Sequence, residues 1–268
     1  IAPYAFADSV KANNTTALND PLSWSNGVVP GTGDLAIWNN TSLNASAIGR
    51  QPQLGADLSW LGIQITNVGG GSTTSATTVV GIQGTANTLT LGSSGIDMSN
   101  AARALRIDTR ILIGADQTWN IRNASTSTNP GAFNNGEDLS FSGTGSIIPF
   151  NLGGRTVSTI GAGQITITSG YVLDDGAISV GNNLFVIQGG NSAVTTVNSS
   201  VTLSILPNSI LHYQSNSGAV ISDATHNLQG GTLRLVSNNG TNAVTLGGAI
   251  DVQNDSALNI GNTFTGGS

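Results

Sequence analysis

The chain has 268 residues, of which 8% are charged and 38% are hydrophobic, with a formal net charge of −6 and no cysteine. Its eight basic residues give too weak a positive field to attract nucleic acid or an anionic membrane surface. The lack of cysteine excludes disulfide bonds, thiolate metal sites and thiol catalysis.

The first residues contain a pattern that is typical of exported proteins. Ala5-Phe6-Ala7 is a small-x-small sequence of the kind that signal peptidase cleaves, and the polar Asp8 follows it directly. The segment is either the end of a signal peptide or an ordinary apolar first strand. Under both interpretations we expect a secreted protein, extracellular or on the surface of a Gram-negative-type bacterium, with no membrane insertion of this segment itself.

Residues 1–60 differ from the rest of the chain. They hold Trp24, Trp38 and Trp60, four of the seven prolines, and few clean alternations of apolar and polar residues. We interpret this region as an N-terminal cap whose tryptophans plug the open end of a hydrophobic core. A platform that stacks sugars on the tryptophans is the alternative.

From residue 61 onward, short β-type segments alternate with Gly, Asn, Ser or Asp turns. Apolar and polar residues alternate within each segment, which is the period of a strand with one buried face. No window of comparable length has a convincing helical period, so the sequence predicts an all-β fold. The predicted strands include residues 61–66, 88–91, 104–113, 164–168, 177–180, 183–187, 201–205 and 232–236.

The regular spacing of these strands favours a right-handed parallel β-helix over residues 61–268. Such a solenoid stacks each coil on the next and leaves only two ends with unpaired strand edges. Coils of about 20 to 25 residues would give roughly eight to ten turns. Trp119, at the start of a strand, is expected to be structural and largely buried, and six aliphatic residues are expected to point inward: Ile165, Ile167, Val201, Leu203, Leu233 and Leu235.

Several strings resemble those of secreted bacterial proteins with autotransporter-associated β-strand repeats. They are WSNGVVPGTGDLAIW (24–38), LGIQI (61–65), GIDMS (95–99), LIGADQTWNI (112–121) and LQGGTL (228–233). The resemblance spans most of the chain, from about Trp24 to Ile260. It implies a passenger-like parallel β-helix at or beyond the cell surface, with no family-wide catalytic residues. We expect neither the membrane barrel nor the sorting signal of that family within residues 1–268.

Two pairs of neighbouring acids are candidate sites. Glu137-Asp138 falls in a segment, 123–138, that we interpret as an exposed loop, and Asp174-Asp175 precedes a glycine. Adjacent residues of a strand point to opposite faces, and Asp is a common turn residue, so both pairs are interpreted as turns rather than as catalytic acids. A structural calcium ion at Asp174 and Asp175 is the alternative; no other cofactor is expected.

The remaining candidates for chemistry are few. Arg103, Arg106 and Arg110 lie near Asp97 and Asp108 in the sequence, and cross-coil ion pairing explains them better than a lyase site. For the two histidines, we expect His212 to be exposed on a strand and His226 to lie between strands. A Ser-His-Asp site built from Ser222, His226 and Asp223 has no nucleophile-elbow pattern to support it.

The two ends of the predicted solenoid raise the question of assembly. The C-terminal strand around Ala257–Ile260 is followed by an uncharged tail with no predicted capping helix. Residues 1–18 are long enough to add a strand to a neighbouring subunit, with Ile1, Tyr4, Phe6 and Val10 as its apolar contacts. We therefore expect head-to-tail contacts, which produce open filaments or layers.

The function expected from the sequence is non-enzymatic and structural, as a subunit of a bacterial surface filament, stalk or layer. The first alternative is an adhesin or a passenger that binds cell-surface glycans through solvent-facing side chains. Aromatic residues, which would carry such binding, make up just 5% of the chain. A polysaccharide lyase or hydrolase is the second alternative, and it would need several acids, or an acid and an arginine, in one cleft.

Overall fold

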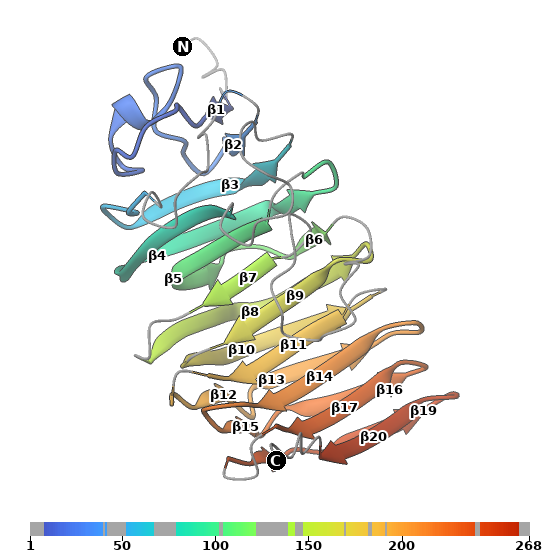
Figure 1. Ribbon diagram of the computed structural model, residues 1–268. Coiled ribbons are helices and arrows are strands. Elements are labelled where there is room, and N and C mark those ends of the chain that lie inside the picture. The colour runs from blue at the N-terminus through green and yellow to red at the C-terminus, as the bar shows by residue number, and fades with distance from the viewer. Residues whose placement is uncertain are drawn as a thin grey trace.

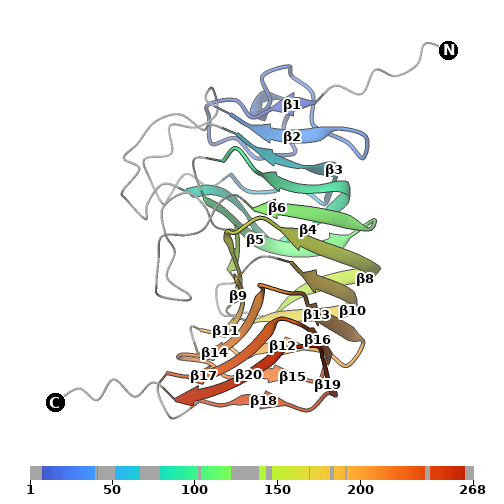
Figure 2. The same cartoon turned by 90° about the vertical axis from the view of Figure 1, so that its right-hand side faces the viewer.

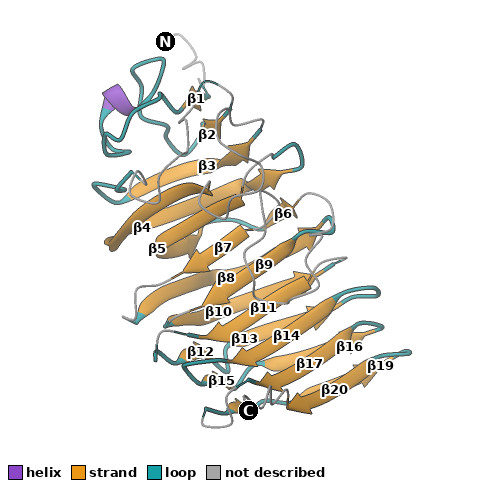
Figure 3. Cartoon of the chain, viewed as in Figure 1, coloured by secondary structure: helices purple, strands orange, loops and turns teal. Residues whose placement is uncertain are grey.

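The computed structural model describes residues 8–39, 41, 52–66, 79–101, 104–121, 139–142, 147–168, 170–181, 184–190, 192–238 and 242–262. These residues form a stack of parallel strands, with β1 (Ser9–Val10) and β20 (Ala257–Asn262) at opposite ends (Figures 1 and 2). The stack is a β-solenoid of about eight turns, which confirms the predicted fold class. The helix of the described part is the short 3-10 helix η1 (Pro21–Ser23), drawn in purple in Figure 3.

The strands of the solenoid lie on three faces. On each face, a strand pairs in parallel with the equivalent strand of the next coil. Face 1 contains β7 (Leu139–Ser142), β9 (Gln164–Thr168), β11 (Leu184–Gly189), β14 (Ile210–Ser215), β17 (Thr232–Ser237) and β20. Face 2 contains β12 (Thr195–Val197), β15 (Val220–Ser222) and β18 (Val244–Leu246). Face 3 contains β1, β2 (Leu35–Trp38), β6 (Gln117–Ile121), β13 (Val201–Ile205), β16 (Thr225–Gln229) and β19 (Ile250–Gln253).

Five longer strands bend around the corners and belong to more than one face. The N-terminal part of β10, for example, pairs with β12 on face 2, and its C-terminal part pairs with β13 on face 3. The corner-spanning strands are β3 (Leu58–Ile65), β4 (Val79–Met98), β5 (Ala104–Ile113), β8 (Ile148–Ile160) and β10 (Tyr171–Val180).

Inward side chains of successive coils lie in rows, because the strands are parallel and in register. The rows of face 1 join Ile165 to Phe185 and Ile167 to Ile187 in neighbouring coils. Five of the six residues expected to point inward are fully buried, and Leu235 is half-buried against the core. Burial of one such aliphatic side chain contributes roughly 1.5 to 3 kcal/mol to folding.

The parallel stack reaches further toward the N-terminus than the expected boundary between residues 60 and 61. β2 pairs with β3 in parallel, and β1 pairs with β2, so Val10 is already hydrogen-bonded within its own chain. Ile1, Tyr4 and Phe6 lie outside the described residues. Trp24, Trp38 and Trp60 are buried with ring centroids about 6 Å apart, in mainly edge-to-face contacts at the N-terminal end of the core.

Candidate functional site

Trp119 lies inside the core and not on a binding surface. It is fully buried, and its indole Nε1–H donates a hydrogen bond of 3.0 Å to Gln117 Oε1. Its ring contacts Phe141 and Phe150, whose centroids lie 5.3 and 6.1 Å away, and Tyr171 extends the same aromatic cluster. The cluster fills the middle of the solenoid and is out of reach of a ligand.

Asp174 and Asp175 form a turn at the corner of β10. Asp175 has a φ of +54°, and the Ser200 hydroxyl donates a hydrogen bond to Asp174, which lowers the pKa of that carboxyl group. Both arrangements are those of ordinary turn residues. Glu137 and Asp138 lie outside the described residues, and no three acids or histidines of the described part gather into a possible metal site.

Ser222 and His226 are linked inside the core, because both are within hydrogen-bond distance of the same tyrosine. The Tyr213 hydroxyl lies 3.0 Å from Ser222 Oγ and 2.8 Å from His226 Nε2, and all three side chains are fully buried. Asp223 is exposed to solvent and is not part of this cluster. Burial lowers the pKa of His226, so the neutral ring is favoured. These contacts pair the Tyr213 hydroxyl with Ser222 Oγ and His226 Nε2, while His226 Nδ1 is buried without a hydrogen-bond partner. No substrate can reach the buried serine.

The expectation that His212 is exposed was wrong. It lies in β14 on the outer side of face 1, between Val186 and Arg234 of the neighbouring coils, yet it is only 2% exposed. Neither ring nitrogen has a hydrogen-bond partner. Burial, and then the charge of Arg234, lowers its pKa from 6.5 to about 4. Alternation alone distinguishes the inner face of a strand from its outer face, but it cannot show whether the outer face is covered.

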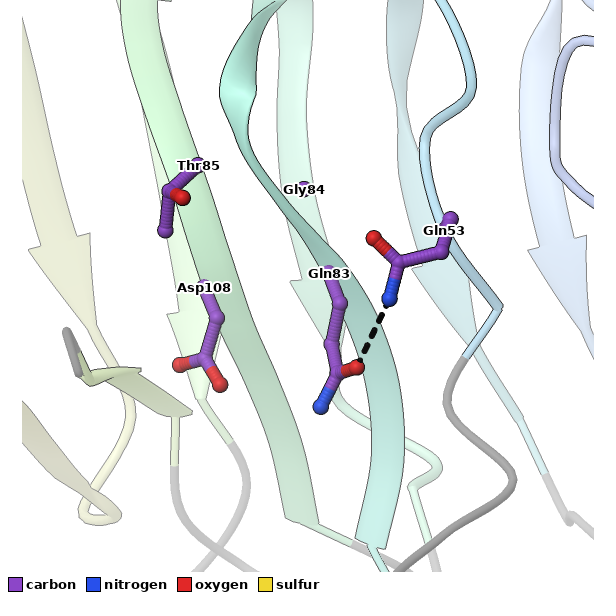
Figure 4. Close-up of a pocket in the computed structure, with 5 residues that line it drawn as sticks. All are labelled: Gln53, Gln83, Gly84, Thr85 and Asp108. Atoms are coloured by element: carbon purple, nitrogen blue, oxygen red, sulfur yellow. Dashed lines mark hydrogen bonds between the residues drawn. The ribbon is translucent and has the colours of Figure 1, made fainter.

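A groove of about 170 Å³ lies on the outer side of face 1, near its N-terminal end (Figure 4). Gln53, Gln83 and Asp108 come from three successive coils and stand side by side, because Gln53 pairs with Gln83 and Gln83 with Asp108. Gln53 Nε2 donates a hydrogen bond of 3.0 Å to Gln83 Oε1. Gly84 and Thr85 complete the described lining.

Asp108 is the charged group of this groove, and it is paired. Arg106, two residues earlier on the same side of β5, contacts both of its carboxylate oxygens, with Nε–Oδ1 3.1 Å and Nη2–Oδ2 2.8 Å. Asp108 is only 3% exposed, and burial raises its pKa although Arg106 opposes the shift. On the inner side of the same strand, the Tyr171 hydroxyl lies within 3.1 Å of the Ile107 and Thr109 carbonyl oxygens.

The chemistry of the groove is that of polar binding. Glycoside hydrolysis uses two carboxyl groups roughly 5 to 10 Å apart, whereas the described lining offers one carboxylate, already in an ion pair with an arginine. Two amide side chains, a hydroxyl group and this ion pair present both donors and acceptors. Such a set suits a neutral, polyhydroxylated ligand.

The expected cross-coil pairing differs from the observed one, because Arg106 pairs with Asp108 of its own strand, β5. No signal in the sequence pointed to Gln53, Gln83 and Thr85 as groove residues. Gln53 and Gln83 are 30 residues apart and come together only through the register of the coils. Each glutamine taken alone is an unremarkable polar residue near a turn. Of the other residues considered, Arg110 is exposed, Asp97 accepts hydrogen bonds from Gln64 and Ser99, and Arg103 lies outside the described residues.

Comparisons with protein-family models, with curated protein sequences and with solved structures give no match to this chain. Within the described residues, no helix has the length and apolar character needed to cross a membrane.

Proposed function

We propose that this protein is a secreted, non-enzymatic structural component of a bacterial cell surface, acting as a rod in a filament, stalk or layer. The observation that carries the proposal is the parallel ladder that joins every described strand from β1 to β20 into one stack. Its continuous core holds the chain in an elongated form without disulfide bonds. A body of this kind sets a distance between whatever is attached to its two ends.

The placement of the reactive side chains supports the same proposal. Ser222 and His226 are used inside the core, and the carboxylate of Asp108 is bound to Arg106. Catalytic groups need access to substrate and a poised protonation state, and neither histidine of the chain is accessible. The resemblance to autotransporter-associated repeats, whose members are secreted passenger-like proteins, agrees with the location that we propose.

Electron microscopy of the purified protein tests the structural role. We expect straight rods, single or associated, and no loss of that shape on addition of chelator, because no three acids or histidines of the described part gather into a possible metal site. Turnover of a polysaccharide by the purified chain, abolished by Asp108→Asn, would contradict the non-enzymatic role. Unfolded or globular particles would contradict the rod itself.

The groove at Gln53, Gln83 and Asp108 favours a second candidate function, which is binding of a neutral glycan. Its volume of about 170 Å³ suits one sugar ring, and its lining offers amide, hydroxyl and charged groups. If the groove binds glycans, Gln83→Ala should abolish a signal seen on a glycan array. Gln229→Ala is the matched control, since Gln229 is a half-buried glutamine on face 3, away from the groove. A signal that survives Gln83→Ala would exclude this groove as the binding site.

A further inference from the structure

The two histidines of the chain lie in the same turn of the solenoid. His212 is in β14 and His226 is in β16, and together with β15 these strands make up residues 210–229, which we call the histidine coil. The coil pairs with β11, β12 and β13 on one side and with β17, β18 and β19 on the other. Figures 1 and 2 show it within the stack, with further strands on both sides. A charge gained by either imidazole therefore acts on one layer of the rod.

The histidine coil also concentrates buried polar atoms that lack hydrogen-bond partners. The described residues contain seven such side-chain atoms, and four of them belong to this coil: both ring nitrogens of His212, Gln214 Oε1 and His226 Nδ1. Each of these atoms costs free energy, because nothing in the fold replaces the hydrogen bond that it makes to water in the unfolded chain. We therefore expect this coil to open more easily than the coils on its N-terminal side.

The surroundings of His226 favour an uncharged ring. The ring is fully buried, and its register partners in the two neighbouring coils are the aliphatic residues Leu203 and Ile250. The Tyr213 hydroxyl lies 2.8 Å from Nε2 and 3.0 Å from Ser222 Oγ, so the polar contacts of the ring are also neutral. A proton on this ring would bring a charge into the core.

Other groups around His226 compensate that charge only in part. The carbonyl oxygens of Ala224 and Ala249 favour the protonated ring, but burial outweighs them and lowers the pKa of His226. Asp223, at the corner that precedes β16, is exposed to solvent. A charge that is buried without an ionic partner is costly. Opening of the coil, which admits water to the ring, relieves this cost.

His212 adds a second charge to the same coil. It is 2% exposed, and the described strands packed against it bring Val186 from β11 and Arg234 from β17. A protonated His212 would therefore stand next to a guanidinium group, and like charges repel. Burial and then this arginine lower the pKa of His212 to about 4. Both histidines thus resist protonation as long as the coil is closed.

We propose that the histidine coil is an acid-sensitive break point of the rod: when its imidazoles take up protons, residues 210–229 open as a unit while the coils from β3 to β13 stay folded. The described strands β17 to β20 are joined to the rest of the stack through β14, β15 and β16. Opening of the histidine coil therefore uncouples them from the N-terminal part. This property goes beyond the proposed structural role, because it gives the rod a point at which acid shortens it.

Hydrogen exchange of the full chain at pH 7 and pH 5, read by mass spectrometry of peptides, tests the proposal. After correction for the intrinsic exchange rates, we expect the protection of β14 and β16 to fall about tenfold or more at pH 5. The protection of β4 and β8 should change little, so that the acid effect is local.

Two variants and a control assign the effect to the imidazoles. The double variant His212→Leu with His226→Leu should lose the acid response, and it leaves the Tyr213 hydroxyl paired with Ser222 Oγ. His212→Leu alone, at a ring without hydrogen-bond partners, should lose part of the response even if the double variant does not fold. Circular dichroism at pH 7 checks the fold of each variant. Asp223→Asn, which removes the exposed carboxylate beside β16, is the matched control and should keep the full response.

The other outcomes overturn the proposal in distinguishable ways. Equal loss of protection in all strands at pH 5 would mean that acid unfolds the rod as a whole. A response that survives both histidine substitutions, or one that disappears in Asp223→Asn, would assign the effect to carboxyl groups. Unchanged protection of β14 and β16 at pH 5 would exclude the break point and leave the structural role intact. That role is read separately, from the particle shape at pH 7.

Discussion

Two buried tryptophans of the core differ in the hydrogen bonds that they make. The Trp119 indole donates to Gln117, whereas the Trp60 indole N–H is buried without a partner. Both rings bury apolar area in the core, but only Trp119 also holds a neighbouring polar side chain, that of Gln117, by a hydrogen bond. An unpaired buried N–H costs free energy comparable to a lost hydrogen bond, so the two positions should respond differently to the same substitution.

We expect Trp119→Phe to destabilise the protein by about 1 to 2 kcal/mol more than Trp60→Phe. The first change leaves the side-chain oxygen Oε1 of Gln117 buried without its donor, and the second removes an N–H group that had no partner. Chemical denaturation of both variants measures the difference. Equal losses of stability would mean that ring volume alone decides the effect.

His212 and His226 make the stability of the fold depend on pH. In the unfolded chain a histidine takes up a proton near pH 6.5, whereas the pKa of His212 in the fold is lowered to about 4. Between these values the unfolded state binds more protons. The stability contributed by the neutral His212 ring is therefore complete above pH 6.5 and is lost as the pH falls toward 4, and the lowered pKa of His226 acts in the same direction.

The free energy of unfolding should accordingly decrease between pH 7 and pH 5, by up to about 1.4 kcal/mol per pH unit for each histidine. His212→Leu removes one of the two groups and should reduce the slope, with little loss of stability at pH 7 because the ring nitrogens of His212 have no partners. Urea denaturation at fixed pH values measures the slope. A slope unchanged by the substitution would assign the effect to other groups.

At the scale of the element, the corners decide where one face ends and the next begins. β4 turns from face 2 to face 3 at Gly95, which has a φ of +61°. A Cβ atom at this position would lie 2.3 Å from the Thr118 carbonyl oxygen of the next coil. Gly154, in β8, also has a positive φ of +69°, but a Cβ atom there would meet nothing within 4 Å.

Alanine substitutions at these two glycines distinguish the cost of backbone strain from the cost of a steric clash. Gly154→Ala should cost about 1 kcal/mol, which is the usual penalty for a side chain at positive φ. Gly95→Ala should cost roughly 1 to 3 kcal/mol more, because the neighbouring strand must also move and lose part of its ladder. Thermal denaturation of the two variants tests this order, and a larger loss for Gly154→Ala would be inconsistent with the packing at the corner.

At the scale of the whole molecule, the stack is uneven along its axis. Its N-terminal end is closed by tryptophans and its middle holds the aromatic cluster around Trp119, but the residues of the last coil are mostly exposed. In a solenoid each coil gains stability chiefly from its two neighbours. The terminal coil has one described neighbour, so it should open before the others.

Hydrogen exchange should therefore be graded along the axis. In dilute protein we expect amides of β19 and β20 to exchange fastest and those of β9 and β11 to exchange slowest, since local opening follows the number of buried contacts. Mass spectrometry of peptides from the exchanged protein resolves these strands. Uniform protection along the stack would show that the solenoid unfolds as one cooperative unit.

The class of the fold and much of its inner surface follow from the pattern of residues along the chain. Alternation of apolar and polar residues gave β5, β9 and β13 their bounds, because a strand has a period of two whatever it packs against. Other features follow only from the tertiary structure. The register between coils forms the groove of Gln53, Gln83 and Asp108, and the bending of one coil at its corners brings Tyr213 to Ser222 and His226. Register joins residues about 20 to 40 positions apart through the lengths of intervening turns, and no local pattern records it.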